Sequence, residues 1–507
     1  MKVKLYDFFN VAKSEIILNP IMVICGDNGT GKTHLVKLLS SINESIMEGK
    51  IFDVQKEEIN EFKKFFDIDY IKDCITKNQN VELSINESNL DTFYLFIEKL
   101  LNKKISKKLN YILKNTYVDG QKKLKKLEMT FIKKVPMSIS IFFKPIINRE
   151  IIEDILSNHK LPTNVLSMIN DKLEGDFNSS FDANFNIESQ NFKSSFGFSM
   201  LSEELALENK LNNVLETLLE YIFAHMYQLN ISNTKLSRNY YYLPASREAY
   251  HKDLELFTQK RKNKNNTLIS RYVIDDEGKK FENFYSMDPF IEKYIDNILE
   301  VLATKEKPKK NNDLDKFLNY FEKNILKAEI LVDSGNVNFK LPNKDVISAD
   351  MASSLQNEYS FLKILIERVN KPNLIIEEPE SHLSIKNAIS LAYFLICFQE
   401  KHSNILWITT HNNFVGDAIN NLIMISKLDE KSQKFYLEKI GLSELLTTFR
   451  DDISNKTHAY LLQNDSIMEL PKNDYGIDFN YFKSHINSFI DISSELQFAL
   501  ENTIDTN

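Results

Sequence analysis

Residues 21–25 (Ile-Met-Val-Ile-Cys) form an unbroken apolar run that follows Pro20. A short apolar run with a turn residue at its start is typical of a strand that is buried on both faces. Residues 34–39 then repeat apolar side chains at helical spacing. The pattern therefore predicts a buried strand, a loop and a helix between residues 20 and 40.

The rest of the chain alternates between strand-like and helix-like patterns. Two short strands are expected before residue 20, and apolar residues three and four apart predict an amphipathic helix at residues 207–223. Alternating or aromatic-rich stretches predict strands at residues 129–132, 138–143, 181–198 and 240–244, and a hairpin at residues 328–341. Residues 353–425 predict helix, strand, helix and strand, whereas the segment beyond residue 426 looks mostly helical.

These elements predict an α/β protein. We expect a head with a mostly parallel core sheet, an antiparallel β subdomain and a large mixed, mainly helical insertion. At 507 residues the chain exceeds one ordinary hydrophobic core. We predict that residues 1–45 and 236–425 form the head, residues 46–235 the insertion, and residues 426–507 a mostly helical extension.

Composition indicates the compartment. Hydrophobic residues make up 43% and charged residues 26% of the chain, as in globular proteins. The longest apolar run, residues 389–398, has about half the length that a membrane span needs. Residues 1–6 do not resemble a signal peptide, and the three cysteines show no metal or redox spacing. We therefore expect a cytoplasmic protein without membrane attachment.

Residues 26–33 (Gly-Asp-Asn-Gly-Thr-Gly-Lys-Thr) fit the pattern G-x-x-x-x-G-K-[ST] between the predicted strand and helix. Such a loop cradles phosphates with main-chain N–H groups, here at Asn28, Gly29 and Gly31. Lys32 is expected to bridge the β- and γ-phosphates and Thr33 to hold Mg²⁺, which predicts ATP and Mg²⁺ as cofactors. The alternative is a chance match in a glycine-bearing turn, but the chain has only 12 glycines.

The second half of such a site is expected where two later strands end. An apolar strand leads into Glu377 and Glu378, and we predict that Glu377 holds the metal and that Glu378 is the general base for the attacking water. A further strand leads to His411, which can reach the γ-phosphate because ligands bind at the carboxyl ends of parallel strands. The alternatives are a surface acidic turn and a structural histidine.

Ser353 and Ser354 precede an apolar helix. Paired serines at this place are ordinary N-caps. The same geometry can present hydroxyl and N–H groups to the γ-phosphate of another protomer. Both interpretations stay open, and they are compatible with each other.

Lysines are concentrated in one part of the predicted insertion. Eleven lysines lie between Asn102 and Val135, where Asp119 and Glu128 are the only acidic residues. We keep nucleic acid as an alternative partner of this Lys103–Lys134 cluster. Lysine runs are usually solvated faces, however, and the net charge of −8 argues against a wholly basic surface.

The order of these motifs resembles one known family. A P-loop, Ala-Ser-Ser before a helix, Glu-Glu-Pro-Glu-Ser-His-Leu at residues 377–383 and then Thr-Thr-His are similar to the ABC-type ATPases of the overcoming-lysogenisation-defect (OLD-like) group. Residues 242–247 (Tyr-Leu-Pro-Ala-Ser-Arg) are also similar to a strand of that group. The resemblance covers residues 1–40 and about 236–425.

The resemblance implies an ABC-type head-to-tail homodimer, or a higher homo-oligomer, that sandwiches two ATP molecules. In each site one subunit would supply the catalytic and phosphate-binding groups, namely Lys32, Thr33, Glu377, Glu378 and His411. Ser353 and Ser354 would come from the other subunit. Three positions depart from the family pattern: Leu355 replaces a signature glycine, Ala245 stands near the place of a metal-sensing glutamine, and Ser384 replaces an aspartate of transporter sequences.

No nuclease motif accompanies the ATPase motifs. The sequence shows no Toprim, His-Asn-His or paired-Cys pattern, and the acidic residues Asp313 and Asp315 lie in a polar linker. The chain therefore resembles the stand-alone ATPase subunits of two-component phage-defence systems such as PARIS and Septu, which implies an antiviral switch that controls a separate nuclease or toxin. An ATP-bound scaffold that sequesters an effector, and a RecF- or Rad50-like DNA-repair ATPase, stay as alternatives.

Overall fold

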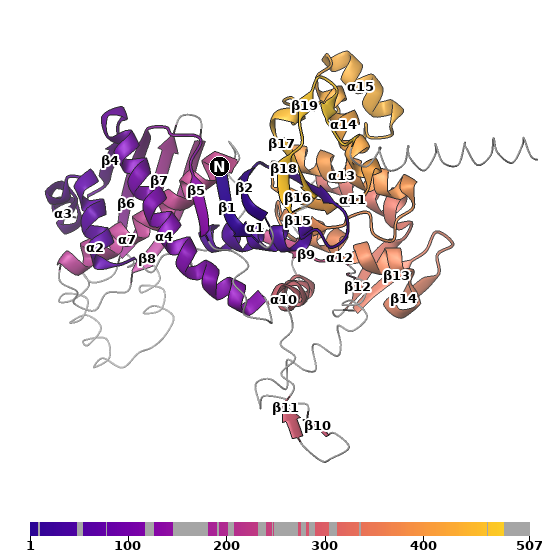
Figure 1. Ribbon diagram of the computed structural model, residues 1–507, viewed down its shortest axis with the longest axis horizontal. Helices are drawn as coiled ribbons and strands as arrows, with labels where there is room; N and C mark the ends of the chain where they lie inside the picture. The colour runs from indigo at the N-terminus through magenta and orange to yellow at the C-terminus, as the bar shows by residue number, and fades with distance from the viewer. Residues whose placement is uncertain are drawn as a thin grey trace, which may run out of the picture. The chain divides into compact units, whose positions relative to one another are not determined.

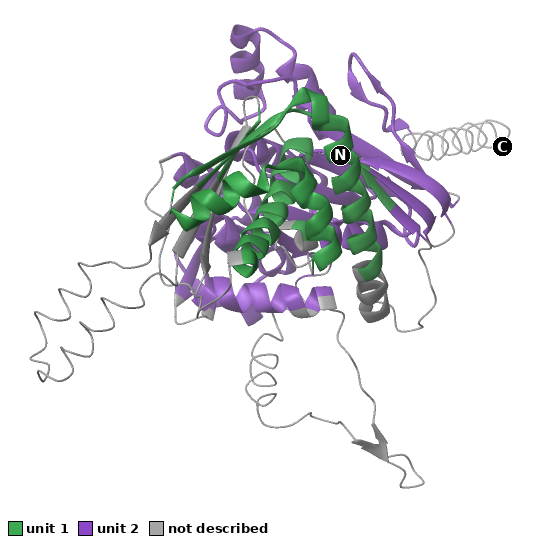
Figure 2. Ribbon diagram, turned by 90° about the vertical axis from the view of Figure 1, so that its left-hand side faces the viewer, with its two compact units in different colours: residues 1–2, 45–108, 128–235 green, residues 3–44, 109–127, 236–507 purple. Residues whose placement is uncertain are grey.

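The computed structural model describes residues 1–8, 11–47, 54–77, 79–116, 126–145, 181–189, 192–200, 207–231, 240–245, 247, 272–274, 280–282, 289–303, 312–333, 336–463 and 465–480. The chain forms two compact units (Figure 2). Unit 1 comprises residues 1–2, 45–108 and 128–235, and unit 2 comprises residues 3–44, 109–127 and 236–507.

Unit 2 is built on a six-stranded sheet in the order β18-β17-β3-β16-β15-β9. The five strands from β17 to β9 run parallel to one another, and β18 is antiparallel to β17. These strands are β3 (Ile21–Gly26), β9 (Tyr240–Leu243), β15 (Asn373–Glu377), β16 (Leu406–Thr410), β17 (Thr457–Gln463) and β18 (Ser466–Glu469). The sheet agrees with the mostly parallel core that the apolar runs predict.

One face of this sheet packs on helices. Ile21, Val23, Ile376 and Ile408 share one buried apolar cluster with residues of six helices. These helices are α10 (Pro289–Ala303), α11 (Asn312–Phe321), α12 (Ser354–Arg368), α13 (Ile385–His402), α14 (Asn413–Ser426) and α15 (Glu430–Lys439), and Figure 1 shows α13 and α14 beside the sheet.

The opposite face of the sheet carries Glu377. Ile24, Thr409 and Glu377 are neighbours in register across β3, β16 and β15. Because side chains alternate along a strand, these three residues lie on the face opposite to Val23 and Ile376. Helix α1 (Lys32–Met47) follows β3 directly through the predicted phosphate-binding loop.

Smaller elements complete unit 2. They are β1 (Lys2–Phe8), β2 (Val11–Ile17), β10 (Tyr272–Ile274), β11 (Lys280–Glu282), a π-helix (Glu322–Leu326), β12 (Glu329–Asp333), β13 (Asn336–Lys340), β14 (Val346–Ser348), β19 (Lys472–Asn473), β20 (Gly476–Ile477), and short 3₁₀ turns at Ala349–Met351 and Ile453–Asn455. Strands β12, β13 and β14 form an antiparallel sheet, and β12 and β13 are the predicted hairpin.

Two predictions about unit 2 differ from the structure. The described part of the segment beyond residue 426 is not mostly helical, because β17 and β18 from this part extend the core sheet. Strand β17 pairs with β3, which lies more than 400 residues earlier, so no local pattern reveals the pairing. Asp313 and Asp315 lie in the first turn of α11 and not in a linker, since Leu314, Phe317 and Phe321 pack against the core.

Unit 1 contains a four-stranded antiparallel sheet in the order β4-β6-β7-β8. Its strands are β4 (Val81–Ile85), β6 (Met137–Pro145), β7 (Phe181–Ser189) and β8 (Phe192–Met200), and its helices include α2 (Lys56–Phe62), α3 (Ile68–Thr76) and α7 (Leu207–Ile231), with 3₁₀ turns at Lys63–Phe65 and Glu87–Asn89. Helix α4 (Leu90–Thr116) and strand β5 (Lys126–Thr130) have residues in both units.

Helix α7 packs in unit 1 as its sequence pattern predicts. Its buried residues recur three and four positions apart, at Leu211, Val214, Leu215, Leu218, Leu219, Ile222 and Phe223. Glu208 in its first turn forms ion pairs with Lys63 and Lys72, at 2.6 and 3.1 Å. These pairs connect α7 to α3 and to the turn after α2 within the same unit.

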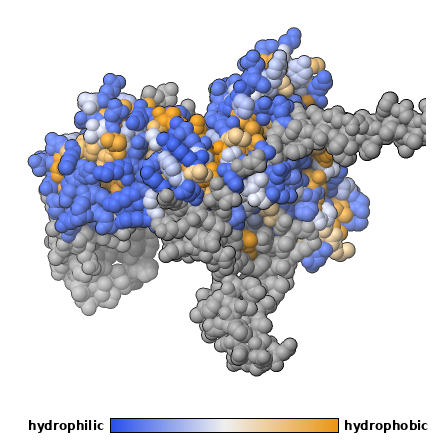
Figure 3. All heavy atoms as spheres, viewed as in Figure 1, coloured by the Kyte–Doolittle hydropathy of each residue, from blue (hydrophilic) through white to orange (hydrophobic). Residues whose placement is uncertain are grey.

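The surface shown in Figure 3 is mostly hydrophilic, with apolar side chains in separate patches. Across the residues that the structure describes, we find no helix whose length and apolar character would let it cross a bilayer.

Candidate functional site

The loop between β3 and α1 folds around the side chain of Lys32. Lys32 Nζ donates hydrogen bonds to the carbonyl oxygens of Gly26 and Asp27, at 2.8 and 2.9 Å. Burial lowers the pKa of Lys32, while the negative charges of Glu378 and Glu380 act in the opposite direction. Phosphate oxygens can replace the two carbonyls, because a charged acceptor binds an ammonium group more strongly than a neutral one does.

Glycines shape this loop at three places. Gly29 and Gly31 have φ angles of 82° and 94°, in the left-handed region that other residues rarely adopt. Gly26 lies against β17, where an added Cβ would stand 2.4 Å from Leu462 O. Asn28 and Gly29 are exposed, so the tip of the loop is open to a ligand. The structure thus places the predicted phosphate-binding positions of this motif on the loop and in the first turn of α1.

Glu377 ends β15 and is buried, with 4% of its surface exposed. Its Oε2 accepts a hydrogen bond from Ala245 N at 3.2 Å, whereas its Oε1 is buried and has no hydrogen-bond partner among the described residues. A buried carboxylate oxygen without a partner is costly, so this atom is suited to a cation that a ligand brings. Carboxylate and hydroxyl oxygens are the ligands that Mg²⁺ prefers.

Thr33 is the second candidate metal ligand. It lies in the first turn of α1 and is half-buried. Glu377 stands two strands away from Ile24 across the sheet, which is roughly 10 Å. Mg²⁺ usually takes one or two protein ligands and completes its shell with phosphate oxygens and water. Thr33 and Glu377 would be the two protein ligands of such an ion.

Glu378, Glu380 and His411 meet where β15 and β16 end. His411 Nδ1 lies 3.7 Å from Glu378 Oε1 and 3.6 Å from Glu380 Oε1. Glu380 Oε1 also accepts hydrogen bonds from Thr410 Oγ1 at 2.5 Å and from His411 N at 3.1 Å. The structure therefore brings both predicted catalytic residues, Glu378 and His411, to the same edge of the sheet.

The backbone of Glu378 is held in an uncommon conformation. Its φ angle is 43°, in the left-handed region. Its N–H group donates to Thr409 O and to Thr409 Oγ1, both at 3.1 Å, so the end of β16 fixes the turn. Such strain is characteristic of functional sites, where the surrounding structure maintains it. Ser381 N donates to Glu378 O at 3.0 Å and closes the turn from the other side.

Glu380 is a residue of this site that sequence reasoning missed. It belongs to the motif at residues 377–383, and the sequence alone assigns it no role. Its side chain is 3% exposed, and burial raises its pKa against the opposing hydrogen bonds from Thr410 and His411. The signal available in the sequence was its place three residues after Glu377. The register of β15 and β16, which sets its contacts, could not be read from the sequence.

Ser353 is the N-cap of α12. Its Oγ accepts a hydrogen bond from Gln356 N at 3.3 Å, and its own N–H donates to Gln356 Oε1 at 3.0 Å. Ser354 is the first residue of the helix, and both serines are exposed. The N-cap prediction is confirmed, and the contact with the phosphate of a second protomer stays a prediction.

A buried arginine connects α12 with the ends of β9 and β15. Arg247 Nη1 donates to Pro244 O and to Glu377 O, both at 2.9 Å, and Arg247 Nη2 pairs with Glu358 Oε1 at 2.8 Å. Burial alone would lower the pKa of Arg247. Interactions with its neighbours, of which that with Glu358 is the strongest, outweigh burial and raise the pKa. The pair is almost completely buried, so it belongs to the internal framework of the site.

Tyr359 adds a second connection from α12. Its hydroxyl donates to Pro379 O at 2.5 Å and to Ser381 O at 2.9 Å. Both carbonyls belong to the turn that carries Glu378 and Glu380. Helix α12 therefore stabilises this turn through Tyr359 and also presents Ser353 and Ser354 at its start.

Part of the Lys103–Lys134 cluster is neutralised. Lys103 and Lys104 each pair with a different oxygen of Glu58 at 2.6 Å, and Lys134 pairs with Asp91 at 3.7 Å. These contacts reduce the charge available to nucleic acid. Lys108, Lys114, Lys122, Lys123 and Lys125 lie outside the residues whose side chains the structure describes.

Comparisons with known proteins give a limited result. Neither the models of known protein families nor the curated proteins include a match. The chain is similar to the solved SMC head domain from Thermotoga maritima, with a TM-score of 0.29, 10% identity and coverage of 93% of this chain and 98% of that chain.

Two further solved structures are similar at the same level. One is an Smc head domain with an extended coiled coil, bound to the C-terminal domain of ScpA and derived from Pyrococcus furiosus, with a TM-score of 0.29, 10% identity and coverage of 98% of both chains. The other is an Smc head bound to the C-winged helix domain of ScpA, with a TM-score of 0.28, 11% identity and coverage of 92% and 97%. At these scores we base no conclusion on the likeness.

Proposed function

We propose that this chain is an ATP-binding and ATP-hydrolysing P-loop ATPase of the ABC type that acts as a switch. The observation that carries the proposal is the convergence of one buried lysine, three carboxylates and one histidine at the carboxyl edge of a single parallel sheet. Ligands of parallel α/β sheets bind at this edge. The phosphate-binding loop and the unpaired Oε1 of Glu377 suit Mg²⁺ and ATP.

Each residue has one role in this proposal. Lys32 leaves its two carbonyl partners and binds phosphate oxygens, and Thr33 and Glu377 hold Mg²⁺. Glu378, whose side chain is 27% exposed, accepts the proton of the attacking water. His411 contacts the γ-phosphate from the neighbouring strand. When bound, Mg²⁺ neutralises part of the charge on the phosphate oxygens.

The switch requires a second copy of the chain. Ser353 and Ser354 are exposed at the start of α12, where they can contact the nucleotide of a partner protomer. We propose that ATP closes a homodimer and that hydrolysis opens it. The motif at residues 377–383 supports a finer proposal, in which the switch controls a separate nuclease or toxin in prokaryotic antiviral defence.

Substitution of the proposed base tests the ATPase function. Glu378→Gln keeps the shape of the side chain and removes the proton acceptor, so we expect phosphate release to fall by about 10²–10⁴-fold with little change in ATP affinity. Glu329→Gln is the matched control, because Glu329 pairs with Lys340 on the surface of the same unit. Unchanged turnover in Glu378→Gln would remove Glu378 from the mechanism.

The same variant separates the switch from the alternative scaffold. If the chain is a switch, wild-type protein should release its effector during turnover and Glu378→Gln should retain it with ATP. A scaffold should hold the effector equally well in both proteins. Candidate effectors are the products of adjacent genes, and co-purification with added ATP measures retention.

A further inference from the structure

We propose that Glu380 is a positioning residue for His411, which holds the imidazole ring in the orientation that contacts the γ-phosphate. This inference deepens the proposed ATPase function and rests on it. Glu380 need not touch the nucleotide for this role, because it acts through His411.

Glu380 Oε1 lies at the end of β16, where it contacts both Thr410 and His411. Glu380 Oε1 accepts hydrogen bonds from the main-chain N–H of His411 at 3.1 Å and from Thr410 Oγ1 at 2.5 Å. The same oxygen lies 3.6 Å from His411 Nδ1. Glu380 therefore fixes the backbone of His411 by a hydrogen bond and also lies beside its ring, where Glu378 Oε1 is 3.7 Å from the same nitrogen. With Nδ1 on the carboxylate side, Nε2 is the nitrogen that remains for the phosphate.

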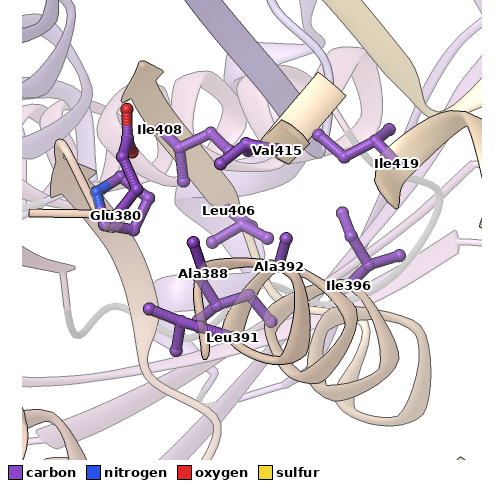
Figure 4. A pocket seen from close by; sticks show the side chains of 11 residues that line it. Glu380, Ala388, Leu391, Ala392, Ile396, Leu406, Ile408, Val415 and Ile419 are labelled. Atoms are coloured by element: carbon purple, nitrogen blue, oxygen red, sulfur yellow. The ribbon is translucent and has the colours of Figure 1, made fainter. Parts of the chain in front are cut away.

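The packing around Glu380 keeps its carboxylate in this place. Glu380 stands at one end of a small apolar cavity of about 10 Å³ that is lined by Ala388, Leu391, Ile408 and Val415 (Figure 4). Figure 4 shows the carboxylate directed away from these apolar side chains. Rotation toward the cavity would place a charge among apolar groups, which is strongly unfavourable. The side chain is thus restricted to the orientation that contacts Thr410 and His411.

The two carboxylates beside His411 differ in their surroundings. Glu378 is 27% exposed, and its Oε1 lies 3.7 Å from His411 Nδ1. Glu380 is 3% exposed and makes three contacts with residues at the end of β16. Glu378 therefore has the access to water that a general base needs, whereas Glu380 has the rigidity that a positioning group needs. Burial raises the pKa of Glu380, and the hydrogen bonds from Thr410 and His411 act against that shift.

A merely structural role for Glu380 is the competing explanation. A buried carboxylate that only supports the loop after β15 would affect turnover whether or not His411 is present. A positioning residue affects turnover through His411 alone. The two explanations therefore differ in a double-mutant cycle, which measures whether two side chains act together.

The experiment combines Glu380→Gln with His411→Ala in the full chain. Glutamine retains the size and an acceptor oxygen but loses the charge that faces Nδ1. With His411 present, we expect Glu380→Gln to lower kcat about tenfold with ATP affinity unchanged. In the His411→Ala background, adding Glu380→Gln should leave kcat unchanged. Phosphate release gives kcat, and titration with ATP gives the affinity.

Three results would overturn the inference. They are an equal reduction by Glu380→Gln in both backgrounds, no reduction in either, and a His411→Ala variant with wild-type kcat. If Glu380→Gln does not fold, Glu380→Asp is used instead, because aspartate keeps the charge and shortens the side chain. The loss of kcat in Glu380→Asp should likewise disappear in the His411→Ala background.

The test is distinguishable from a failure of the proposed function. If wild-type protein hydrolyses ATP and Glu378→Gln does not, the ATPase proposal stands whatever Glu380 does. If wild-type protein neither binds nor hydrolyses ATP, the proposed function fails, and the inference about Glu380 fails with it.

Discussion

The charged groups around Glu58 in unit 1 and those around Lys32 in unit 2 are arranged in opposite ways. In unit 1, Glu58 holds Lys103 and Lys104, one on each oxygen, at 2.6 Å. In unit 2, Lys32 donates to two main-chain carbonyls, and Glu377 Oε1 is buried without a hydrogen-bond partner among the described residues. The first arrangement is complete without a ligand, and the second is suited to receive one. We therefore assign ligand binding to the loop that carries Lys32 and not to the lysines that Glu58 pairs.

The same contrast appears inside unit 2. Arg247 and Glu358 are buried and paired, whereas Glu378 and His411 are partly exposed and lie 3.7 Å apart. Both sets adjoin the turn after β15. The buried pair of Arg247 and Glu358 stabilises the turn. We assign the catalytic roles to the accessible residues, Glu378 and His411.

The largest expected effect is the loss of the buried pair. Arg247→Met removes the partner of Glu358 and the two hydrogen bonds to Pro244 O and Glu377 O. Breaking a buried ion pair typically costs about 3–5 kcal/mol, so unit 2 should unfold at a lower denaturant concentration. Lys340→Met is the control, because its pair with Glu329 is exposed and should contribute little. Equal stability of the two variants would contradict a framework role for Arg247.

A smaller effect on stability is expected from Glu58, which is paired with two lysines in unit 1. Burial raises the pKa of Glu58, but hydrogen bonds from Lys103 and Lys104 outweigh it and hold the pKa below its ordinary value of 4.5. The charged form is thus favoured in the folded state. Its contribution to stability is complete above about pH 4.5 and is lost as the pH falls through the lower folded value.

Glu58→Gln removes this contribution. We expect the free energy of unfolding of unit 1 to fall by about 1–2 kcal/mol at pH 7, and the difference from wild type to shrink as the pH falls below about 4.5. The difference is measured by denaturant unfolding at several pH values, with hydrogen exchange of α2 as the probe of unit 1. A difference that stays constant with pH would show that the lysine pairs do not stabilise the unit.

The smallest effect concerns two serine caps. Ser353 caps α12 and Ser384 caps α13 through the same kind of hydrogen bond, at 3.3 and 3.4 Å. Replacing either serine by alanine should cost about 1 kcal/mol of stability. Only Ser353→Ala should also weaken dimer formation with ATP, measured by sedimentation in the Glu378→Gln background. Equal dimerisation of both variants would leave Ser353 with its capping role alone.

The sequence predicts the parts of the site that have local signals. The apolar run before Gly26 and the loop ending at Thr33 have a pattern that needs no distant partner. Glu377, Glu378 and His411 were likewise predicted, because each follows an apolar strand. The structure adds that the strands are parallel neighbours, which brings these side chains to one edge.

The contacts that depend on distant pairing could not be predicted. Strand β17 carries polar residues at both ends, Thr457 and Gln463, and its pairing with β3 is visible only in the fold. That pairing also explains Gly26, which lies against Leu462 O. The contacts of Glu380 arise from the register of β15 and β16 and not from a spacing within one segment.

Calorimetric titration of ATP into two lysine variants tests the central claim most directly. Lys32→Ala should weaken ATP binding by about tenfold or more, because hydrogen bonds to a charged group contribute about 1.5–3 kcal/mol. Lys103→Ala, which removes a lysine already paired with Glu58, should bind ATP as the wild-type protein does. Wild-type affinity in Lys32→Ala, or the same loss in both variants, would contradict nucleotide binding at this loop.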